Sequence, residues 1–396
     1  MRVVMAPDSF RGTLSAPEAA TALAAGWRRH APDDEVVELP MSDGGPGFLD
    51  AVRAALPGEL VPCTVGDPDG RDVPGAVLLV GPADDPAGVL TVYVDTSQAV
   101  GEHLDRGNAS RAVASRTSRG AGQLLAAALA LRPERLVVGV GRAGVLDGGA
   151  GAIAALLGEG TGDAPGDDVR AVADGGLVAA AAADGAALAG LRDLRDRLAG
   201  VHLVVATDTD APLVGRHGPV RGAGPALGLR GDDLRSAEAA MTAWATVLVD
   251  ALTAAGAADP GRLVALPGAG AGGGLGAALL ALGAEREPGA SVVAEVARLP
   301  EAVADADLVV TGEGAFDWDS LRGRVVGAVA DVAGRHGVPV VVVAGQVLVG
   351  RRELAAVGVE SAYPVAAEPR HVPAAMADPA GTLAARTERV ARTWHR

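Results

Sequence analysis

The chain has 396 residues, a net charge of −15 and 49% hydrophobic residues, of which very few are aromatic. This length and hydrophobic content suffice for a sizeable core and predict two or more domains, while the negative charge disfavours a nucleic-acid partner. All 34 cationic residues are arginine, which excludes a Walker-type or Schiff-base lysine and leaves phosphate contacts to arginines and helix N-termini.

The N-terminal part alternates predicted strands and helices. A short apolar strand at residues 3–6 ends in a turn that contains Asp8. Ser15, with Glu18 three residues later, predicts a capping box at the start of a helix over residues 16–30. A second strand at 36–39 ends in a turn with Asp43, and a helix at 47–55 follows. This order is typical of a parallel α/β sheet.

The middle of the chain has a different pattern. Residues 57–92 hold short β-rich runs punctuated by Pro, Gly and Asp, which indicates an antiparallel or mixed sheet and a domain crossover. Helices are then expected at 115–131 and 237–254, and strands at 136–139 and 203–206. Turns with Asp147, and with Asp208 and Asp210, follow these two strands. A glycine-rich turn at 268–274 opens a further helix at 275–282.

The C-terminal part holds the most regular unit. A strand at 308–311 ends in Gly312-Glu313-Gly314, Asp317 follows at once, and an apolar helical pattern leads to a strand at 338–343. The segment 365–396 is expected to be helical. Carboxylates that follow parallel strands lie at the carboxyl edge of the sheet, where open α/β sheets bind ligands.

Carboxylates in glycine turns suit two chemical roles. They can hold Mg²⁺, which prefers oxygen ligands, or accept a proton from a substrate hydroxyl. The glycines let backbone N–H groups approach an anion, so the turn at 268–274 is a candidate phosphate or carboxylate cradle. Each turn alone is equally compatible with helix capping or plain packing. Trp318, inside the acidic turn, is predicted either to pack in a core or interface or to face a ligand.

Other classes of site are disfavoured. The seven histidines show no metal-ligand spacing, and Cys63 is the single cysteine, so neither a cysteine-based metal site nor a disulfide framework is expected. The N-terminus lacks the apolar stretch of a signal peptide, and the alanine-rich tract 177–191 is too short and too mixed to span a bilayer. We therefore expect a cytoplasmic protein without a membrane partner.

Six motifs occur in an order and spacing that resemble the bacterial two-domain glycerate kinases over nearly the whole chain. They are APDSFRG at 6–12, SDGG at 42–45, TSRGAG at 117–122, DGGAG at 147–151, PGAGAGGGLG at 267–276 and TGEG at 311–314. The resemblance implies a two-domain α/β fold. A flavodoxin-like, doubly wound parallel sheet would comprise residues 1–65 and 285–396. A restriction-enzyme-like domain with a mixed sheet, residues 66–284, would be inserted between them.

The resemblance also implies a function. The family phosphorylates D-glycerate with ATP, usually at the 2-hydroxyl, so we expect ATP- and Mg²⁺-dependent formation of 2-phosphoglycerate or phosphorylation of a related small hydroxy acid. A homodimer is compatible with this expectation.

Within this interpretation we assign roles to individual residues. Asp208, Asp43 and Arg11 are the candidate catalytic residues, with Asp208 or Asp43 as the general base. Glu313, Asp317 and Asp210 are the candidate metal ligands. The candidate substrate and phosphate contacts are Asp8, Ser9, Gly44, Gly45, Asp147, Gly148, Arg230, Gly268, Gly270, Gly272, Gly273 and Arg324.

The chain departs from the family pattern at several positions. Arg11 replaces a lysine, Ala211 replaces an asparagine, and residues 142–146 replace a run of hydroxyl and amide side chains. Two alternatives follow from these losses. The chain could have lost phosphotransfer and bind a metabolite or a partner protein, or Val145 and Leu146 could form an apolar wall for a less polar hydroxy acid.

Overall fold

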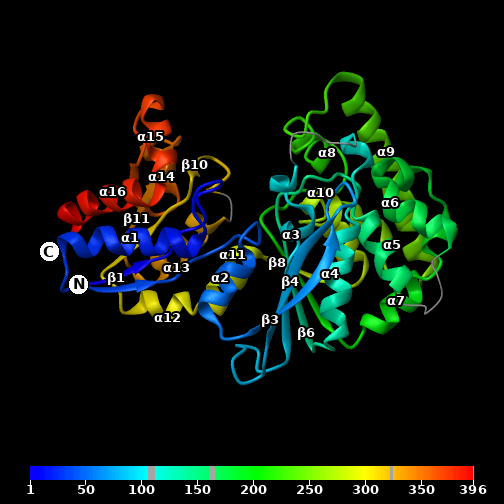
Figure 1. The fold of residues 1–396 in the computed structure, drawn as a ribbon, viewed down its shortest axis with the longest axis horizontal. Coiled ribbons are helices and arrows are strands. Elements are labelled where there is room, and N and C mark those ends of the chain that lie inside the picture. The colour runs from blue at the N-terminus through cyan, green and yellow to red at the C-terminus, as the bar shows by residue number, and fades with distance from the viewer. Residues whose placement is uncertain (106–111, 160–165, 322–323, 396) are drawn as a thin grey trace. The chain divides into compact units, whose positions relative to one another are not determined.

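The computed structural model describes residues 1–105, 112–159, 166–321 and 324–395 (Figure 1). The chain divides into two compact units, each with its own main sheet. Unit 1 consists of Met1–Asp43, Gly47–Pro57 and Pro288–Arg396, and unit 2 consists of Gly44–Pro46 and Gly58–Glu287.

Unit 1 is built on a five-stranded parallel sheet, which confirms the predicted parallel α/β architecture. The strand order is β13-β11-β9-β1-β2, and each neighbouring pair is parallel. The strands are β1 (Arg2–Met5), β2 (Glu35–Glu38), β9 (Leu308–Thr311), β11 (Val340–Ala344) and β13 (Val359–Pro364). The first crossover, from β1 to β2, and the later addition of β9 lie on opposite sides of β1, so the sheet is doubly wound.

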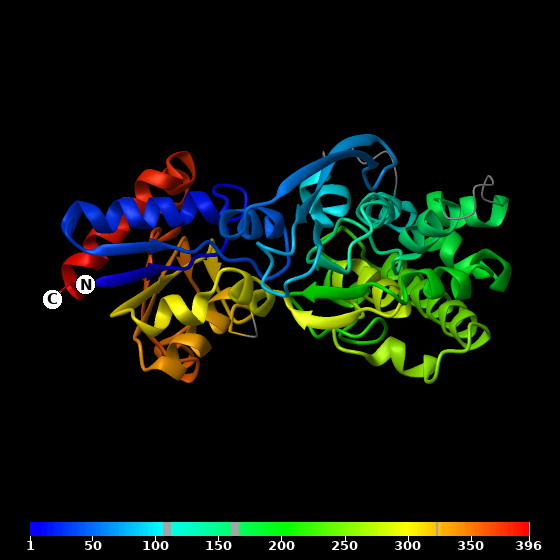
Figure 2. The same cartoon turned by 90° about the horizontal axis from the view of Figure 1, so that it is seen from below.

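Helices cover both faces of this sheet. Figure 2 shows α1 on the opposite side of the sheet from α12. The helices of unit 1 are α1 (Ala16–His30), α2 (Phe48–Ala55), α11 (Gly289–Val296), α12 (Leu299–Ala304), α13 (Val325–His336), α14 (Arg351–Ala356), α15 (Val372–Ala377) and α16 (Pro379–Trp394). The helix predicted over 365–396 is therefore broken into two main pieces. Pro379 begins the second piece, since proline cannot continue the preceding helix.

Helix α1 illustrates how local sequence fixes an element. Ser15 forms the predicted capping box: its hydroxyl accepts a hydrogen bond from the Glu18 backbone N–H, and the Glu18 carboxylate accepts one from the Ser15 N–H at 2.8 Å. One face of the helix buries Leu23 and Trp27 in a core shared with β1, β9 and β11. A side chain at Gly26 would place its Cβ 2.2 Å from the Ala384 carbonyl oxygen, so glycine permits the close packing of α16.

Unit 2 contains a six-stranded sheet in the order β3-β4-β5-β6-β7-β8. Its strands are β3 (Glu59–Gly66), β4 (Asp72–Val80), β5 (Thr91–Asp95), β6 (Arg135–Val140), β7 (His202–Thr207) and β8 (Glu285–Pro288). Strands β3, β4 and β5 pair antiparallel, whereas β5, β6 and β7 pair parallel. The predicted mixed sheet is confirmed. The two units divide before β3, whereas the domain boundary expected from the sequence, between residues 65 and 66, falls inside this strand. The two domain families assigned from the sequence stay predictions.

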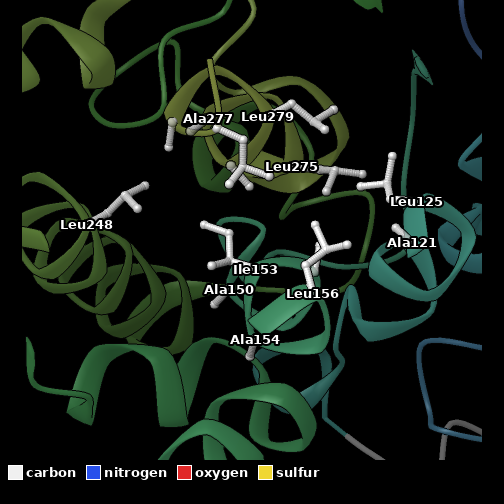
Figure 3. Packing of buried hydrophobic residues seen from close by; sticks show 14 of the residues in the cluster. Ala121, Leu125, Ala150, Ile153, Ala154, Leu156, Leu248, Leu275, Ala277 and Leu279 are labelled. Carbon is white, nitrogen blue, oxygen red and sulfur yellow. The ribbon is translucent and has the colours of Figure 1, made fainter. Parts of the chain in front are cut away.

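Small aliphatic side chains fill the core of unit 2. Its helices are α3 (Ser97–Val100), α4 (Arg119–Ala130), α5 (Ala150–Glu159), α6 (Asp167–Ala182), α7 (Leu191–Leu198), α8 (Pro219–Gly222), α9 (Gly231–Ala254) and α10 (Ala271–Ala281). Figure 3 shows alanine, leucine and isoleucine side chains from α4, α5, α9 and α10 meeting in one cluster. Within the described residues, no helix is both long enough and apolar enough to cross a membrane.

Candidate active site

Three carboxyl groups of unit 1 follow neighbouring parallel strands. Asp8 lies after β1, Asp43 after β2 and Glu313 after β9, and these strands are adjacent in the order β9-β1-β2. Their carboxyl ends therefore meet at one edge of the sheet. The connections leave in opposite directions on the two sides of β1, which makes this edge a topological switch point. Open α/β sheets bind ligands at such a point.

Backbone contacts hold these turns together. The Asp8 N–H donates to the Gly312 carbonyl at 2.8 Å, and the Thr311 hydroxyl donates to the Ala6 carbonyl at 2.7 Å. A Cβ at Gly312 would lie 2.0 Å from the Val343 carbonyl oxygen, so only glycine fits between β9 and β11. The turns after β1, β9 and β11 thus form one rigid edge.

The carboxyl groups at this edge perturb one another. Burial, together with the negative charges of Asp43 and Glu313, raises the pKa of Asp8 well above its usual range. Burial also raises the pKa of Glu313 to about 7, with smaller contributions from the charges of Asp317 and Asp43. Arg11 acts against the shift at Asp8, and Arg324 against the shift at Glu313. The edge concentrates negative charge that two arginines only partly offset.

Residues after Glu313 have separate roles. One carboxylate oxygen of Asp317 accepts hydrogen bonds from the backbone N–H groups of Asp319 and Ser320, at 2.9 and 3.3 Å, and so fixes the turn. Trp318 is 58% exposed, which excludes the core alternative. It is the one strongly exposed aromatic side chain among the described residues. A ligand-facing role for Trp318 stays a prediction.

In unit 2, glycine turns pack directly on one another. The Gly148 N–H donates to the Gly273 carbonyl at 3.0 Å, and the Gly270 N–H donates to the Ala211 carbonyl at 2.8 Å. Gly272, Gly273 and Gly274 all have positive φ. A Cβ at Gly273 would lie 2.0 Å from the Val145 carbonyl oxygen. The predicted glycine cradle is therefore a close-packed turn that continues the carboxyl edge of β6 and β7.

Asp147 organises this turn from the interior. The residue is fully buried, and its carboxylate accepts hydrogen bonds from the Ser118 N–H and hydroxyl at 2.7 and 2.8 Å. The N–H groups of Gly149 and Gly151 donate to the same carboxylate. Burial raises the pKa of Asp147, and these four donors oppose the shift. Both oxygens are occupied by donors of the chain itself, so Asp147 positions the glycine turn.

The turn after β7 contains an ion pair that the sequence did not predict. Arg286, in β8, pairs with Asp210 at 2.5 Å and donates to the Thr207 hydroxyl at 3.1 Å. A Cβ at Gly268 would lie 3.1 Å from the Arg286 side chain. Asp210, a predicted metal ligand, thus faces an arginine, while Asp208 is half-buried beside it. Arg286 was missed because its neighbours in sequence resemble any exposed strand. Only the placement of β8 next to β7 reveals it.

The contacts of the other predicted site residues that follow do not indicate a catalytic role. The Ser9 N–H donates to the Asp8 carboxylate at 2.6 Å. The Arg230 guanidinium donates to the Leu229 and Pro225 carbonyls of its own loop. Gly44 and Gly45 belong to unit 2, although Asp43 beside them belongs to unit 1.

The positions of Val145 and Leu146 bear on the predicted apolar wall for a less polar hydroxy acid. Both are fully buried in the core of unit 2. They cannot form an apolar wall facing a substrate, so the proposal of a less polar hydroxy acid loses its basis. Packing explains why these positions are apolar.

The acidic edge of unit 1 fits Mg²⁺ in its donor chemistry. Mg²⁺ keeps several water ligands and needs only one or two carboxylates from the protein. Glu313 is 8% exposed, and its Oε1 atom has no hydrogen-bond partner within the described part of the chain. An orphaned, buried carboxylate oxygen beside further acids suits a cation. In the same described part, no group of three or more acidic, histidine or cysteine side chains encloses a metal position.

The doubly wound sheet with its acidic switch point and the mixed-sheet unit with its close-packed glycine turns define a two-unit α/β protein with candidate ligand-binding turns at the carboxyl ends of parallel strands. Residues 3–395 match the glycerate kinase family. The chain is 38% identical to an uncharacterized protein of Mycobacterium bovis, over 99% of this chain and 91% of that protein.

It is also 34% identical to glycerate 2-kinase of Escherichia coli, over 87% of this chain and 85% of that enzyme. The crystal structure of a protein named as glycerate kinase 2 from Salmonella typhimurium LT2 superposes with a TM-score of 0.73. It is 30% identical, and the match covers 99% of this chain and 98% of that one. The chain belongs to the glycerate kinase family, as its motifs indicated, and is a kinase-type phosphotransferase with an alcohol group as acceptor.

Proposed function

We propose that this protein transfers the γ-phosphoryl group of ATP to the 2-hydroxyl of D-glycerate in a Mg²⁺-dependent reaction. The observation that carries the proposal is the set of Asp8, Asp43 and Glu313 on three adjacent parallel strands at a switch point, in a chain of this family. Phosphoryl transfer depends mainly on positioning and on neutralising charge, which such an edge can provide.

The chain's own residues have distinct tasks in this reaction. Glu313 and Asp317 would hold Mg²⁺, which when bound neutralises phosphate charge. Arg11 and Arg324 lie near Asp8 and Glu313, where their charges act on those carboxyl groups. Their guanidinium groups can bind a carboxylate or a phosphate through paired hydrogen bonds. By binding the substrate carboxylate, these arginines would orient the acceptor.

The general base remains one of two aspartates. Asp43 is buried at the acidic edge of unit 1, and Asp208 is half-buried after β7 of unit 2. Either can accept the hydroxyl proton as the oxygen attacks phosphorus, because a carboxylate within hydrogen-bond reach of a hydroxyl can serve as a general base. Asp210 is the weaker metal candidate, since its carboxylate already pairs with Arg286.

The test is ADP release by the purified protein with ATP, Mg²⁺ and one acceptor at a time. D-glycerate should support turnover, whereas glycerol, which lacks the carboxylate, should not. Phosphorus NMR of the product separates 2-phosphoglycerate from 3-phosphoglycerate. Absence of D-glycerate-dependent ADP release would overturn the proposal, and release of 3-phosphoglycerate would overturn the stated position.

Loss of phosphotransfer is the competing function suggested by the altered turn at 142–146. Because Val145 and Leu146 are core residues, their apolar side chains are explained by packing, and Ala211, which replaces an asparagine, is the other substitution that favours this alternative. Titration calorimetry with ATP and Mg²⁺ separates the two functions: a kinase binds the nucleotide, and a protein that binds only a metabolite or partner does not.

A further inference from the structure

A cavity lies in unit 2, at the opposite end of the sheet from the glycine turns. Its volume is about 590 Å³, and its walls come from α4, α5, α7 and the residues that precede β6 and β7. Pro133 leads into β6 and Val201 leads into β7, so the cavity lies at the amino ends of these parallel strands. The glycine turns follow their carboxyl ends. The cavity is therefore separate from the candidate active site.

The lining combines an apolar wall with positive charge. Leu129, Leu156, Leu194 and Leu198 are among the apolar residues that line it. The charged residues among those lining the cavity are two arginines, Arg132 and Arg197, and no acidic residue lines it. This combination is unusual in a chain with a net charge of −15. The volume is within the range of small-molecule sites, which are mostly apolar with a few polar groups that fix the ligand.

Arg132 carries a second, independent sign of function. It follows the end of α4 with a φ of 53°, and its N–H donates to the Leu129 carbonyl at 3.0 Å. Glycine is the usual residue at such a helix end, because a side chain strains the left-handed backbone conformation. Apart from Arg298, every other described residue with positive φ is glycine. Strain of this kind is typically retained where the side chain has a task.

The two arginines with positive φ, Arg132 and Arg298, differ in their ion pairing. Arg298 pairs with Glu301 of its own helix at 3.5 Å. Arg132 is exposed and forms no ion pair with any residue that the structure describes. Its guanidinium is thus available at the cavity, and the strain of its backbone is not offset by a partner within the described chain.

We propose that this cavity binds a small amphipathic anion, with an apolar body of one or two rings or a short alkyl chain and a single carboxylate or sulfonate. The apolar body packs on the leucines of α4, α5 and α7. The anionic group lies at Arg132. This site is independent of the proposed kinase function.

The probe is anilinonaphthalene sulfonate, an aromatic anion that fluoresces when it enters an apolar site, titrated into the full chain. We expect saturable binding of one molecule per chain. Arg132→Gly removes the charge and relieves the backbone strain, so it should weaken binding about fivefold while raising the melting temperature. Arg132→Asn, neutral but tolerant of positive φ, should weaken binding equally. Phenylnaphthylamine, the uncharged analogue, should bind with the same affinity to wild type and to both variants.

A steric variant completes the test. Ala130→Trp, at the exposed end of α4, should fill the cavity and abolish binding, whereas Ala380→Trp, on an exposed position of α16, should not change it. Circular dichroism confirms that each variant is folded. The proposal is wrong if the probe does not bind, if Ala130→Trp leaves binding unchanged, or if Arg132→Gly and Arg132→Asn bind the sulfonate as tightly as wild type.

Discussion

Glu313 is the residue whose chemistry depends most strongly on the fold. Its carboxyl group ordinarily has a pKa near 4.5, and burial raises this to about 7. The folded protein therefore binds the Glu313 proton more tightly than the unfolded chain does. The resulting stability is fully present below about pH 4.5 and is lost as the pH rises through about 7.

Glu313→Gln should test this linkage directly. The amide stays neutral, so the variant should be more stable than wild type at pH 8, by on the order of 2 kcal/mol, and equally stable at pH 4.5. Urea unfolding at both pH values measures the difference. Glu295→Gln, on an exposed position of α11, is the control and should show no pH-dependent change. An equal effect of Glu313→Gln at both pH values would contradict the raised pKa.

Asp147 shows a carboxylate used for structure. Asp147→Asn would place an amide N–H₂ group against at least one of the four donors that now converge on it, and should destabilise the protein by about 3 kcal/mol. Asp184→Asn is the matched control, because Asp184 also accepts a backbone hydrogen bond but at an exposed helix start, where asparagine caps equally well. Urea unfolding compares them. Similar losses in the two variants would show that burial of Asp147 is not the cause.

At the scale of elements, helices and strands that are defined by local sequence could be predicted, whereas features that depend on long-range contacts could not. The helix Ala16–His30 was predicted to the residue because Ser15 and Glu18 define its start within the sequence itself. The strand Leu308–Thr311 was equally clear from its apolar, β-branched run. Helix α6 was not predicted. Its Gly176 has non-helical dihedral angles, and a Cβ there would lie 2.4 Å from the Arg116 carbonyl oxygen, so the position requires glycine. No local sequence pattern shows that contact.

The candidate site likewise has parts that local sequence predicts and parts that depend on long-range contacts. The acidic turns that contain Asp8, Asp43 and Glu313 were predicted, because each follows a recognisable strand. Their adjacency depends on strand order, which the motifs supplied only through the family resemblance. The pairing of Arg286 with Asp210 depends on two strands far apart in the sequence and could not be predicted.

The glycine turn that begins α10 should tolerate no side chain. Gly273→Ala would add a Cβ 2.0 Å from the Val145 carbonyl oxygen at a φ of +70°, and should cost at least about 3 kcal/mol. Gly228 has a φ of +97° with nothing within 4 Å of the added Cβ, so Gly228→Ala should cost only about 1 kcal/mol. Thermal and urea unfolding of both variants measure the two costs. Equal costs in the two variants would show that the close contact between Gly273 and Val145 adds no penalty to the substitution.

At the scale of the whole molecule, family membership and the acidic edge support the same proposed chemistry from different observations. The family is shown by motifs spread over almost the entire chain, and the edge is shown by strand order and burial. Of the substitutions that first suggested lost activity, Val145 and Leu146 lie in the core, where packing accounts for them, whereas Ala211 is half-buried and packing does not account for it. The location of the protein in the cytoplasm stays a prediction.

One experiment measures whether Asp43 or Asp208 carries out the proposed proton transfer. The rate of D-glycerate-dependent ADP release is compared for wild type, Asp43→Asn and Asp208→Asn at saturating ATP and Mg²⁺. We expect turnover by wild type and a loss of about 100-fold or more in kcat for the aspartate that acts as general base. Turnover that both variants retain at the wild-type rate, or a wild type that releases no ADP with D-glycerate, would contradict the assignment of this protein as a glycerate-phosphorylating enzyme that uses its acidic turns.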